Sequence, residues 1–190
     1  MALPSTRIDF RIALSNVDLG VEASESLIVA RHPSETAEHL VLRVLAWCLL
    51  YEPGLELGPG LSAPDTAALW KHDLTGRLVT WIECGTASAE KIRKAVQHNP
   101  GAKVHAVFGN ERRRNELTDE LYAWKRAEEV AVWTFDPSLV VALAQSEERR
   151  RRWAVTVVGD HFYLDADGAT VDGAVDRYSW GARINNKEER

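Results

Sequence analysis

Leu78-Val79-Thr80-Trp81-Ile82-Glu83-Cys84-Gly85 is a segment with apolar side chains on both faces of a predicted β-strand. Strands of this kind are normally central and buried. Glu83 is the exception, because a buried carboxylate is costly unless it is paired, hydrogen-bonded or bound to a metal ion. The segment therefore predicts a central strand that carries a candidate functional carboxylate.

Charged residues flank this predicted strand. Asp73 lies ten positions before Glu83, on the preceding arm of a hairpin predicted to turn at Thr75-Gly76, and Lys91 and Lys94 follow on the next predicted helix. Two carboxylates and a lysine around adjacent strands favour a divalent-metal site that cleaves phosphodiesters. A simpler interpretation stays open, in which Glu83 forms a salt bridge with one of the lysines without a metal and Asp73 is only a turn residue.

A third carboxylate is predicted on a helix that opens at residues 31–36 and runs to about Tyr51. Apolar residues at helical spacing define its inner face: Leu42, Leu45, Ala46 and Leu49. Glu38 lies one turn before Leu42 on the same face. We therefore expect Glu38 to face inward, where it either supports the metal site or pairs with Arg43.

The residues at the start of this helix have two interpretations each. Glu35 is either a further supporting carboxylate or a helix-start residue that interacts with the helix dipole. Arg31 and His32 precede a helix N-terminus, a natural anion site, so they are candidates for phosphate or nucleic-acid contact. The alternative for both is a role in capping and packing. The seven tryptophans could likewise stack on bases, but core packing is the favoured interpretation.

The overall composition narrows the class of protein. The chain has 190 residues, 45% of them hydrophobic, and a formal net charge of −5. These values suit a folded domain and do not favour a strongly basic nucleic-acid-binding protein. An enzyme that acts on nucleic acid needs only a positive contact face, so that class stays open. Cys48 and Cys84 stand in apolar segments and are predicted to be buried thiols.

Targeting signals are not predicted. Residues 1–11 lack the apolar region of a signal peptide, and the longest apolar run, residues 40–51, is too short to span a bilayer. We therefore expect a cytoplasmic protein with no membrane partner.

The order of the predicted elements defines the fold class. Strands are predicted at 7–14, 22–30, around Asp73, at 79–83, 103–108, 130–135, 153–158, 161–164 and after Asp167-Gly168, and helices at 31–51, 88–98, 111–126 and 138–143. This order predicts an α/β (α+β) domain with a mixed central β-sheet flanked by helices. We assign residues 1–184 to this single domain and expect residues 185–190 to form a disordered tail.

Three stretches make the chain similar to the YaeQ family of bacterial proteins: Ala-Arg-His-Pro-Ser-Glu-Thr at 30–36, Leu-Arg-Val-Leu-Ala-Trp at 42–47 and Trp-Ile-Glu-Cys-Gly at 81–85. The Lys94-Ala95 pair and the C-terminal hairpin add to a likeness that extends over most of the chain. The family is regarded as a variant of the restriction-endonuclease-like, or PD-(D/E)XK, fold. Pro64-Asp65 spells the name of that motif, but it lies in a predicted loop and we interpret it as a chance match.

The resemblance implies an α-β-β-β-α-β core in which a helix glutamate, a hairpin aspartate, a strand glutamate and a lysine surround a divalent metal. By position, it assigns the hairpin aspartate to Asp73 and the strand glutamate to Glu83. Gly85 stands where the parent motif has lysine, and the resemblance places the lysine on the following helix, at Lys94. Helix geometry instead favours Lys91, which is one turn nearer the end of the strand.

Two functional hypotheses follow. In the first, the protein is a metal-dependent phosphodiesterase or nuclease. Asp73 and Glu83 then bind Mg²⁺ or Mn²⁺, Glu38 supports the ion, and Lys94 or Lys91 contacts the phosphate. In the second, the protein is a non-catalytic binding or regulatory module that keeps the nuclease-like fold, an interpretation favoured by the displaced lysine and the acidic composition. Nucleic acid, either DNA or RNA, is the expected partner of the first.

Overall fold

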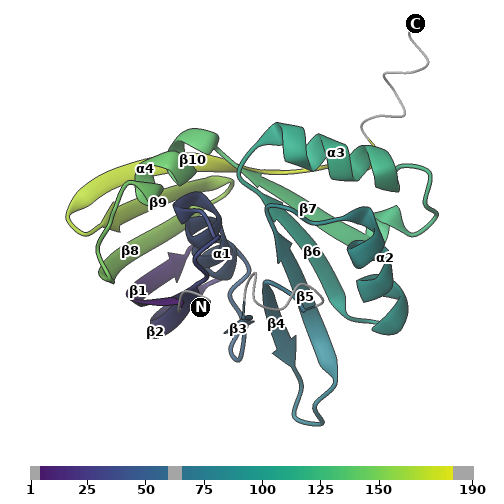
Figure 1. Cartoon of the computed structure of the whole chain (residues 1–190), viewed down its shortest axis with the longest axis horizontal. Helices are drawn as coiled ribbons and strands as arrows, with labels where there is room; N and C mark the ends of the chain where they lie inside the picture. Colours follow the sequence, from purple (N-terminus) through teal and green to yellow (C-terminus); the bar gives the residue numbers. More distant parts are fainter. Residues whose placement is uncertain (1–4, 60–65, 182–190) are drawn as a thin grey trace, which may run out of the picture.

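The structure is a computed structural model that describes residues 5–59 and 66–181. The strands of these residues form one mixed, ten-stranded sheet in the order β2-β1-β8-β9-β10-β7-β6-β5-β4-β3, with helices packed on its faces (Figure 1). The strands are β1 Thr6–Asn16, β2 Val21–Arg31, β3 Glu56–Leu57, β4 Leu69–His72, β5 Leu78–Cys84, β6 Lys103–Phe108, β7 Val130–Phe135, β8 Arg150–Val158, β9 His161–Ala166 and β10 Ala169–Arg177. The helices are α1 Ala37–Leu49, α2 Ala89–His98, α3 Glu111–Leu121, η2 Ala127–Glu129 and α4 Pro137–Ala144. The predicted α+β class with a mixed central sheet is therefore confirmed.

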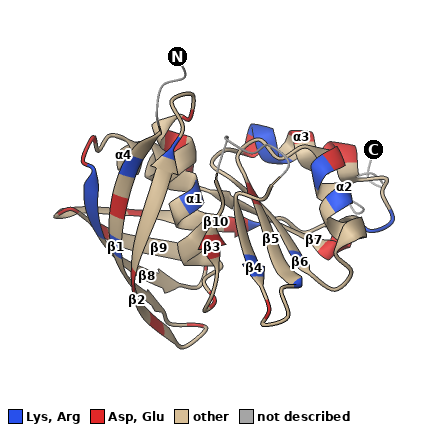
Figure 2. Ribbon diagram, turned by 60° about the horizontal axis from the view of Figure 1, so that its bottom comes forward, with Lys and Arg blue, Asp and Glu red and all other residues tan. Residues whose placement is uncertain are grey.

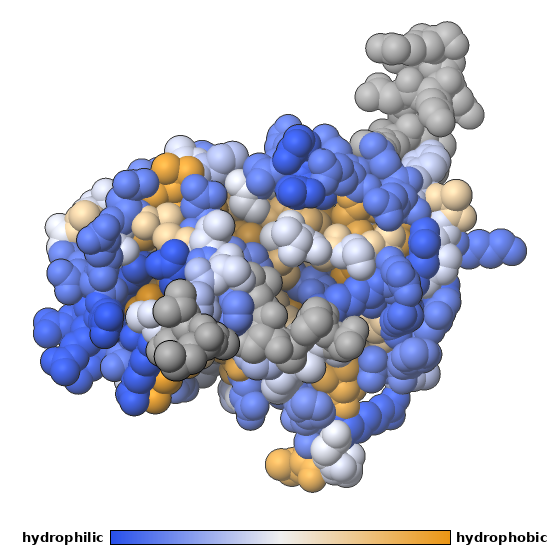
Figure 3. Space-filling model, viewed as in Figure 1, coloured by the Kyte–Doolittle hydropathy of each residue, from blue (hydrophilic) through white to orange (hydrophobic). Residues whose placement is uncertain are grey.

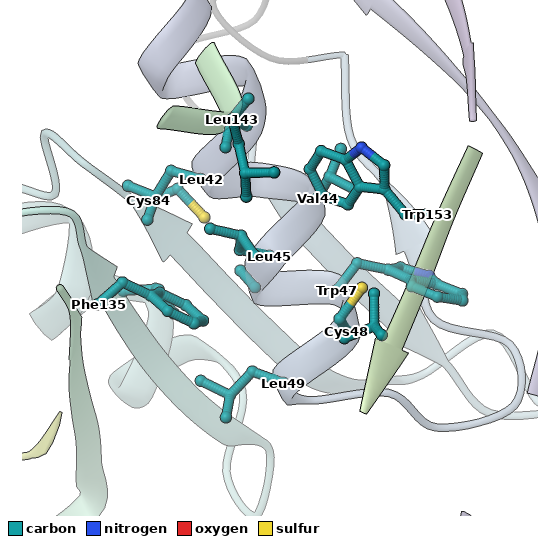
Figure 4. Close-up of a cluster of buried hydrophobic side chains, with 14 of the residues drawn as sticks. Leu42, Val44, Leu45, Trp47, Cys48, Leu49, Cys84, Phe135, Leu143 and Trp153 are labelled. Carbon is teal, nitrogen blue, oxygen red and sulfur yellow. The ribbon is translucent and has the colours of Figure 1, made fainter. Parts of the chain in front are cut away.

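Helix α1 is the centre of the larger hydrophobic core and lies between the two halves of the sheet (Figure 1). Every residue from Leu40 to Leu49 is buried. The core around it combines side chains from β1 and β8, such as Phe10 and Trp153, with side chains from β5 and β7, such as Ile82 and Phe135. Figure 4 shows Leu42, Leu45 and Leu49 of α1 directed toward Cys84 and Phe135. A single helix thus joins both halves of the sheet into one core.

Strand β10 connects the same two halves through backbone hydrogen bonds. Residues Ala169–Ala174 pair with β9 in antiparallel fashion, and Val175–Arg177 pair with β7. Backbone pairing therefore makes the sheet continuous from β2 to β3. Helix α1 packs against strands from both halves of this sheet.

The opposite face of the β5-β6-β7 region is covered by α2 and α3, which form a second hydrophobic core. Ile92 and Val96 of α2 and Leu117 and Leu121 of α3 pack on apolar side chains of β6 and β7. Strands β5, β6 and β7 run parallel, so their carboxyl ends meet at one edge of the sheet. Lys, Arg, Asp and Glu residues mark the outer surfaces of α2 and α3 (Figure 2), and hydrophilic side chains cover most of the face shown in Figure 3.

The N-terminal hairpin joins the sheet by a long-range contact. β1 and β2 are antiparallel over their whole lengths, whereas β1 runs parallel to β8, with Asp9 opposite Arg150 and Asn16 opposite Val157. The inward-facing residues of β1, Ile8, Phe10, Ile12 and Leu14, are all buried.

Three boundaries differ from the sequence prediction. Helix α1 begins at Ala37, because residues before Thr36 form a turn and the Thr36 side chain accepts a hydrogen bond from the His39 backbone N–H. Helix α3 ends at Leu121, so the predicted continuation to residue 126 is wrong. Strand β8 begins at Arg150 and not at residue 153, because residues 150–152 already pair with β1.

Membrane-spanning segments were not predicted. In the two described ranges, no helix combines the length and the apolar character that crossing a bilayer requires. The predicted tail at 185–190 and the Pro64-Asp65 dipeptide lie outside the described residues.

Candidate functional site

Glu83 lies near the carboxyl end of β5, on the face of the sheet that α2 covers. Glu83 is 5% exposed, and both oxygens of its carboxylate accept hydrogen bonds. Trp81 Nε1 donates to Oε1 at 2.8 Å, and Lys91 Nζ donates to Oε2 at 2.9 Å. Lys91 Nζ also donates to the backbone carbonyl of Thr66 at 2.7 Å. The buried carboxylate expected from the strand pattern is therefore present, and it is paired with a lysine of α2.

Burial determines the protonation behaviour of Glu83. Desolvation raises its pKa above the ordinary value, and the opposing charge and hydrogen bond of Lys91, the hydrogen bond of Trp81 and the charge of His39 offset this only in part. A carboxyl group of raised pKa next to an ammonium group is an arrangement common in functional sites.

The structure selects Lys91 over Lys94 as the neighbour of Glu83. Ser88 caps α2, and Lys91 lies at the end of the first turn, where its side chain reaches back to β5. Lys94 lies one turn later, is 61% exposed, and pairs with Glu90 on the same helix at 2.7 Å. Glu83 therefore contacts Lys91, the lysine that helix geometry favoured, and which lysine contacts a phosphate stays a prediction.

Asp73 does not join this site, and its expected proximity to Glu83 is wrong. Its carboxylate accepts hydrogen bonds from the Thr75 backbone and hydroxyl and from the Arg77 backbone, within the turn between β4 and β5. The hydroxyl of Thr75, with these backbone donors, lowers the pKa of the exposed Asp73. Pairing of the two strands ends at His72–Leu78. At about 3.3 Å per residue, five residues place Glu83 roughly 16 Å farther along β5, too far for one metal ion to bind both carboxylates.

Glu35, and not Glu38, is the carboxylate that faces inward near the start of α1. Glu38 is exposed, at the start of α1. Glu35 is 1% exposed and contacts two cationic side chains. Its Oε1 accepts from Arg43 Nη1 at 3.1 Å and lies 2.6 Å from His39 Nδ1. The predicted inward orientation of Glu38 and its pairing with Arg43 are thus wrong, because Glu35, from the turn before the helix, pairs with Arg43 instead.

Burial and the neighbouring polar groups have opposite effects on the pKa of Glu35. Burial alone would raise the pKa of Glu35, but the hydrogen bond from His39 and the charges of Arg43 and His39 outweigh it and lower the pKa. His39 Nε2 lies 3.2 Å from the backbone carbonyl of Cys84. The imidazole of His39 thus lies between two acceptor oxygens, the Glu35 carboxylate and the Cys84 carbonyl. Arg43 Nη2 also donates to the Gly58 carbonyl at 2.6 Å.

His39 connects this network to the strand that carries Glu83. Its ring packs against the backbone immediately after Cys84, where a β-carbon on Gly85 would lie 2.9 Å from His39 Cδ2. Gly85 has φ = +74°, a left-handed conformation that favours glycine. Glycine at position 85 therefore has a local cause, which is the close approach of α1.

Arg31 and His32 belong to the turn that positions Glu35. Arg31 Nε donates to the Glu35 carbonyl at 2.9 Å, and the His32 backbone N–H donates to Glu35 Oε2 at 3.3 Å. The His32 ring contacts Ser34 Oγ at 2.6 Å. These contacts support the packing interpretation of both residues, and their phosphate contacts stay a prediction.

Two residues of the site were not singled out from the sequence. His39 lies four residues after Glu35 and four before Arg43, a spacing that places all three on one side of the chain entering α1. Trp81 precedes Glu83 by two positions and therefore shares its face of the strand. Both signals are present in the sequence, but each is weak without a known strand direction and helix start.

Comparison with known proteins identifies the family. The family model described as "YaeQ protein" matches residues 1–175. The chain belongs to the YaeQ family. It is 29% identical to the uncharacterised YaeQ protein of Salmonella typhi over 86% of this chain and 90% of that protein. It is 28% identical to the uncharacterised YaeQ protein of Escherichia coli K12 over 88% and 92%.

Crystal structures of other YaeQ proteins have the same fold. The YaeQ protein of Xanthomonas axonopodis pv. citri is 29% identical, with a TM-score of 0.82 over 92% of this chain and 98% of that one. The YaeQ protein of Pseudomonas syringae is 26% identical, with a TM-score of 0.83 over 94% and 98%. The YaeQ fold therefore includes the N-terminal hairpin and the C-terminal strands as well as the region around Glu83.

Glu83 and Glu35 should contribute to stability with opposite pH dependence. The raised pKa of Glu83 means that the folded protein binds its proton more tightly than the unfolded chain does. Its contribution therefore falls as pH rises from about 4.5 through the raised pKa. The lowered pKa of Glu35 has the opposite effect. The contribution of Glu35 to stability is present above about pH 4.5 and is lost as the pH falls through the lowered pKa.

The contribution of Glu83 to the pH dependence of stability is measured by urea unfolding of the wild type and of Glu83→Gln at several pH values between acid and neutral. Relative to the wild type, Glu83→Gln should gain stability as pH rises through this window. Parallel pH curves for the two proteins would show that Glu83 has the same pKa in the folded and unfolded states.

Proposed function

We propose that this YaeQ family member is a metal-dependent phosphodiesterase or nuclease of the PD-(D/E)XK type, with Glu83 and Lys91 at its centre. The observation that carries the proposal is the buried carboxylate–ammonium pair near the carboxyl end of β5, beside a pocket lined by α2. The order α1-β3-β4-β5-α2-β6 corresponds to the α-β-β-β-α-β order that the resemblance implies, which supports the proposal.

The donor set fits a metal ion that binds together with its substrate. No group of three His, Cys, Asp or Glu residues within residues 5–59 and 66–181 could hold an ion by itself. Mg²⁺, however, is usually bound by one or two carboxylates together with water and substrate phosphates. Glu83 would hold Mg²⁺ or Mn²⁺, and the ion would supply charge neutralisation and an activated water. Asp73 and the exposed Glu38 have no place in this set.

Lys91 has the position required of a phosphate ligand. Its ammonium group lies 2.9 Å from Glu83 and has a side chain that is 25% exposed, so an anion entering from the pocket can reach it. Glu83 would hold the ion, and the Lys91 ammonium group would hold a phosphate oxygen and stabilise the charge that develops there. Trp81 keeps the carboxylate oriented through its indole N–H.

One observation favours the alternative of a non-catalytic binding module. Each oxygen of Glu83 already has a donor, Trp81 for one and Lys91 for the other, and the pair is complete without a metal. A salt bridge of this kind can be purely structural.

The two proposed functions predict different effects of Lys91→Met on turnover. Turnover is measured with Mn²⁺ and with single- and double-stranded DNA and RNA as substrates. For the nuclease we expect kcat to fall about 100- to 1,000-fold, the usual loss when one stabilising donor is removed, while Mn²⁺ still raises the melting temperature by mass action. Glu83→Gln should abolish both the activity and this rise in melting temperature. The folded fraction of each variant is measured by circular dichroism.

Lys71→Met and Glu52→Gln are the matched controls. Lys71 of β4 and Glu52 of the loop between α1 and β3 form another partly buried pair, at 3.0 Å and with side chains 23% exposed. Both variants should keep the activity and the response to Mn²⁺. Loss of turnover in Lys94→Met but not in Lys91→Met would assign the phosphate contact to Lys94. A wild type that neither cleaves nor responds to Mn²⁺ would support the non-catalytic module.

A further inference from the structure

A pocket of about 460 Å³ lies between β5 and α2 and is lined by Trp81 and Lys91, the two residues that donate hydrogen bonds to Glu83. It is lined by Trp81, Ser88, Glu90, Lys91, Lys94, Ala95, His98 and Asn99. Figure 1 shows α2 at the edge of the molecule. Most of its lining side chains are polar, but one wall is the indole of Trp81.

Trp81 is shared by the pocket and the candidate site. Its N–H edge faces Glu83, to which it donates the 2.8 Å hydrogen bond, while other atoms of the residue line the pocket. Lys91 Nζ lies 5.9 Å from the centre of the indole ring. A group bound on the indole would therefore lie next to the ammonium group proposed to hold a phosphate.

The aromatic surface continues onto the neighbouring strand. Trp70 of β4 stands directly opposite Trp81 of β5 in the antiparallel register, and residues paired in this way point to the same face of a sheet. Both tryptophans are partly exposed. Two adjacent indoles next to lysines are the combination that proteins use to bind single-stranded nucleic acid, in which bases stack on aromatic rings and cations follow the backbone.

We propose that the Trp81 pocket is a nucleoside subsite that stacks an unpaired base of a single-stranded substrate on the indole and places the adjoining phosphate at Lys91. The proposal rests on the proposed phosphodiesterase function and names its substrate class. A base within a duplex cannot reach the indole, because its faces are covered by its neighbours. Lys94 and His98 line the outer part of the pocket, where the backbone of the strand would leave it.

The test is binding of a short oligothymidylate that carries one 2-aminopurine, measured in EDTA so that metal-dependent cleavage does not occur. The fluorescence of 2-aminopurine should be quenched as it stacks, and a duplex of the same sequence should bind more weakly. Loss of one base–aromatic stack weakens binding about 5- to 100-fold, and we expect this loss in Trp81→Leu. Trp81→Phe keeps an aromatic ring but loses the N–H donor to Glu83, so it should retain most of the binding.

Trp180→Leu is the matched control, because Trp180 packs on the same core and donates its indole N–H at 2.9 Å to Val130, but does not line the pocket. It should bind like the wild type. Lys94→Glu is a second test of the pocket. The Lys94 side chain is 61% exposed, so the substitution should leave the core intact and should also weaken binding. Unchanged affinity in Trp81→Leu, or in Lys94→Glu if Trp81→Leu does not fold, would overturn the subsite.

Cleavage assays with Mn²⁺ separate this proposal from the function on which it rests. Quenched, Trp81-dependent binding without cleavage would support the pocket and contradict the nuclease. Cleavage by the wild type with no quenching, or with an unchanged KM in Trp81→Leu, would support the nuclease and contradict the pocket. A wild type that does not bind the oligonucleotide overturns the pocket proposal.

Discussion

Arg43→Met should lower the free energy of unfolding by about 3–5 kcal/mol, the usual cost of breaking a buried ion pair by removing one partner. Arg43 and Glu35 are each 1% exposed. The substitution keeps most of the side-chain volume but removes the guanidinium group that contacts the Glu35 carboxylate and the Gly58 carbonyl. Urea unfolding monitored by tryptophan fluorescence gives the value.

Two further variants distinguish the loss of a charge partner from the loss of packing. The double variant Glu35→Leu/Arg43→Met replaces both charges with apolar groups and should recover much of the stability, as paired apolar replacements often do. Lys94→Met removes an exposed pair with Glu90 and should change stability little. A double variant no more stable than Arg43→Met would show that the network is needed for more than charge balance.

Leu45→Ala should destabilise the protein by about 2–5 kcal/mol, the range for a large-to-small substitution that leaves a cavity in a core. Leu45 is fully buried on α1, where the two halves of the sheet share one core (Figure 4). Because this helix contacts both halves, the protein should still unfold in one cooperative transition. Separate transitions for tryptophan fluorescence and far-ultraviolet circular dichroism would instead show that the two halves unfold independently.

The fold was largely predictable because hydrophobic periodicity is local. Alternation in β1 and in the hairpin of β8 and β9, the cap at Ser88 and the helical spacing in α2 all lie within single elements. The start of α1 was harder, because Pro33 and Ser34 suit either a first helical turn or the turn before it. With residues 33 and 34 in a turn, Glu35 and not Glu38 pairs with Arg43.

The candidate site was predictable only in part. Glu83 was found because a charged residue inside an apolar strand is unusual, and Lys91 because helix geometry brings it near the strand end. Asp73 was misplaced because a hairpin brings residues together only where their registers match, and register depends on the length of the turn. The network of Glu35, His39 and Arg43 depends on contacts between α1 and β5, which no local pattern contains.

The parallel pairing of β1 with β8 has a consequence for how the chain is synthesised and folds. The two strands are joined across some 140 positions of sequence, from Asp9 to Arg150, so the pairing edge of β1 stays open until most of the polypeptide has left the ribosome. Contacts of such long range slow folding, and apolar strands that wait for them are exposed to aggregation in the meantime. We therefore expect nascent chains that end before β8 to depend on chaperones, and truncation of the C-terminal third to leave an insoluble product rather than a smaller folded unit.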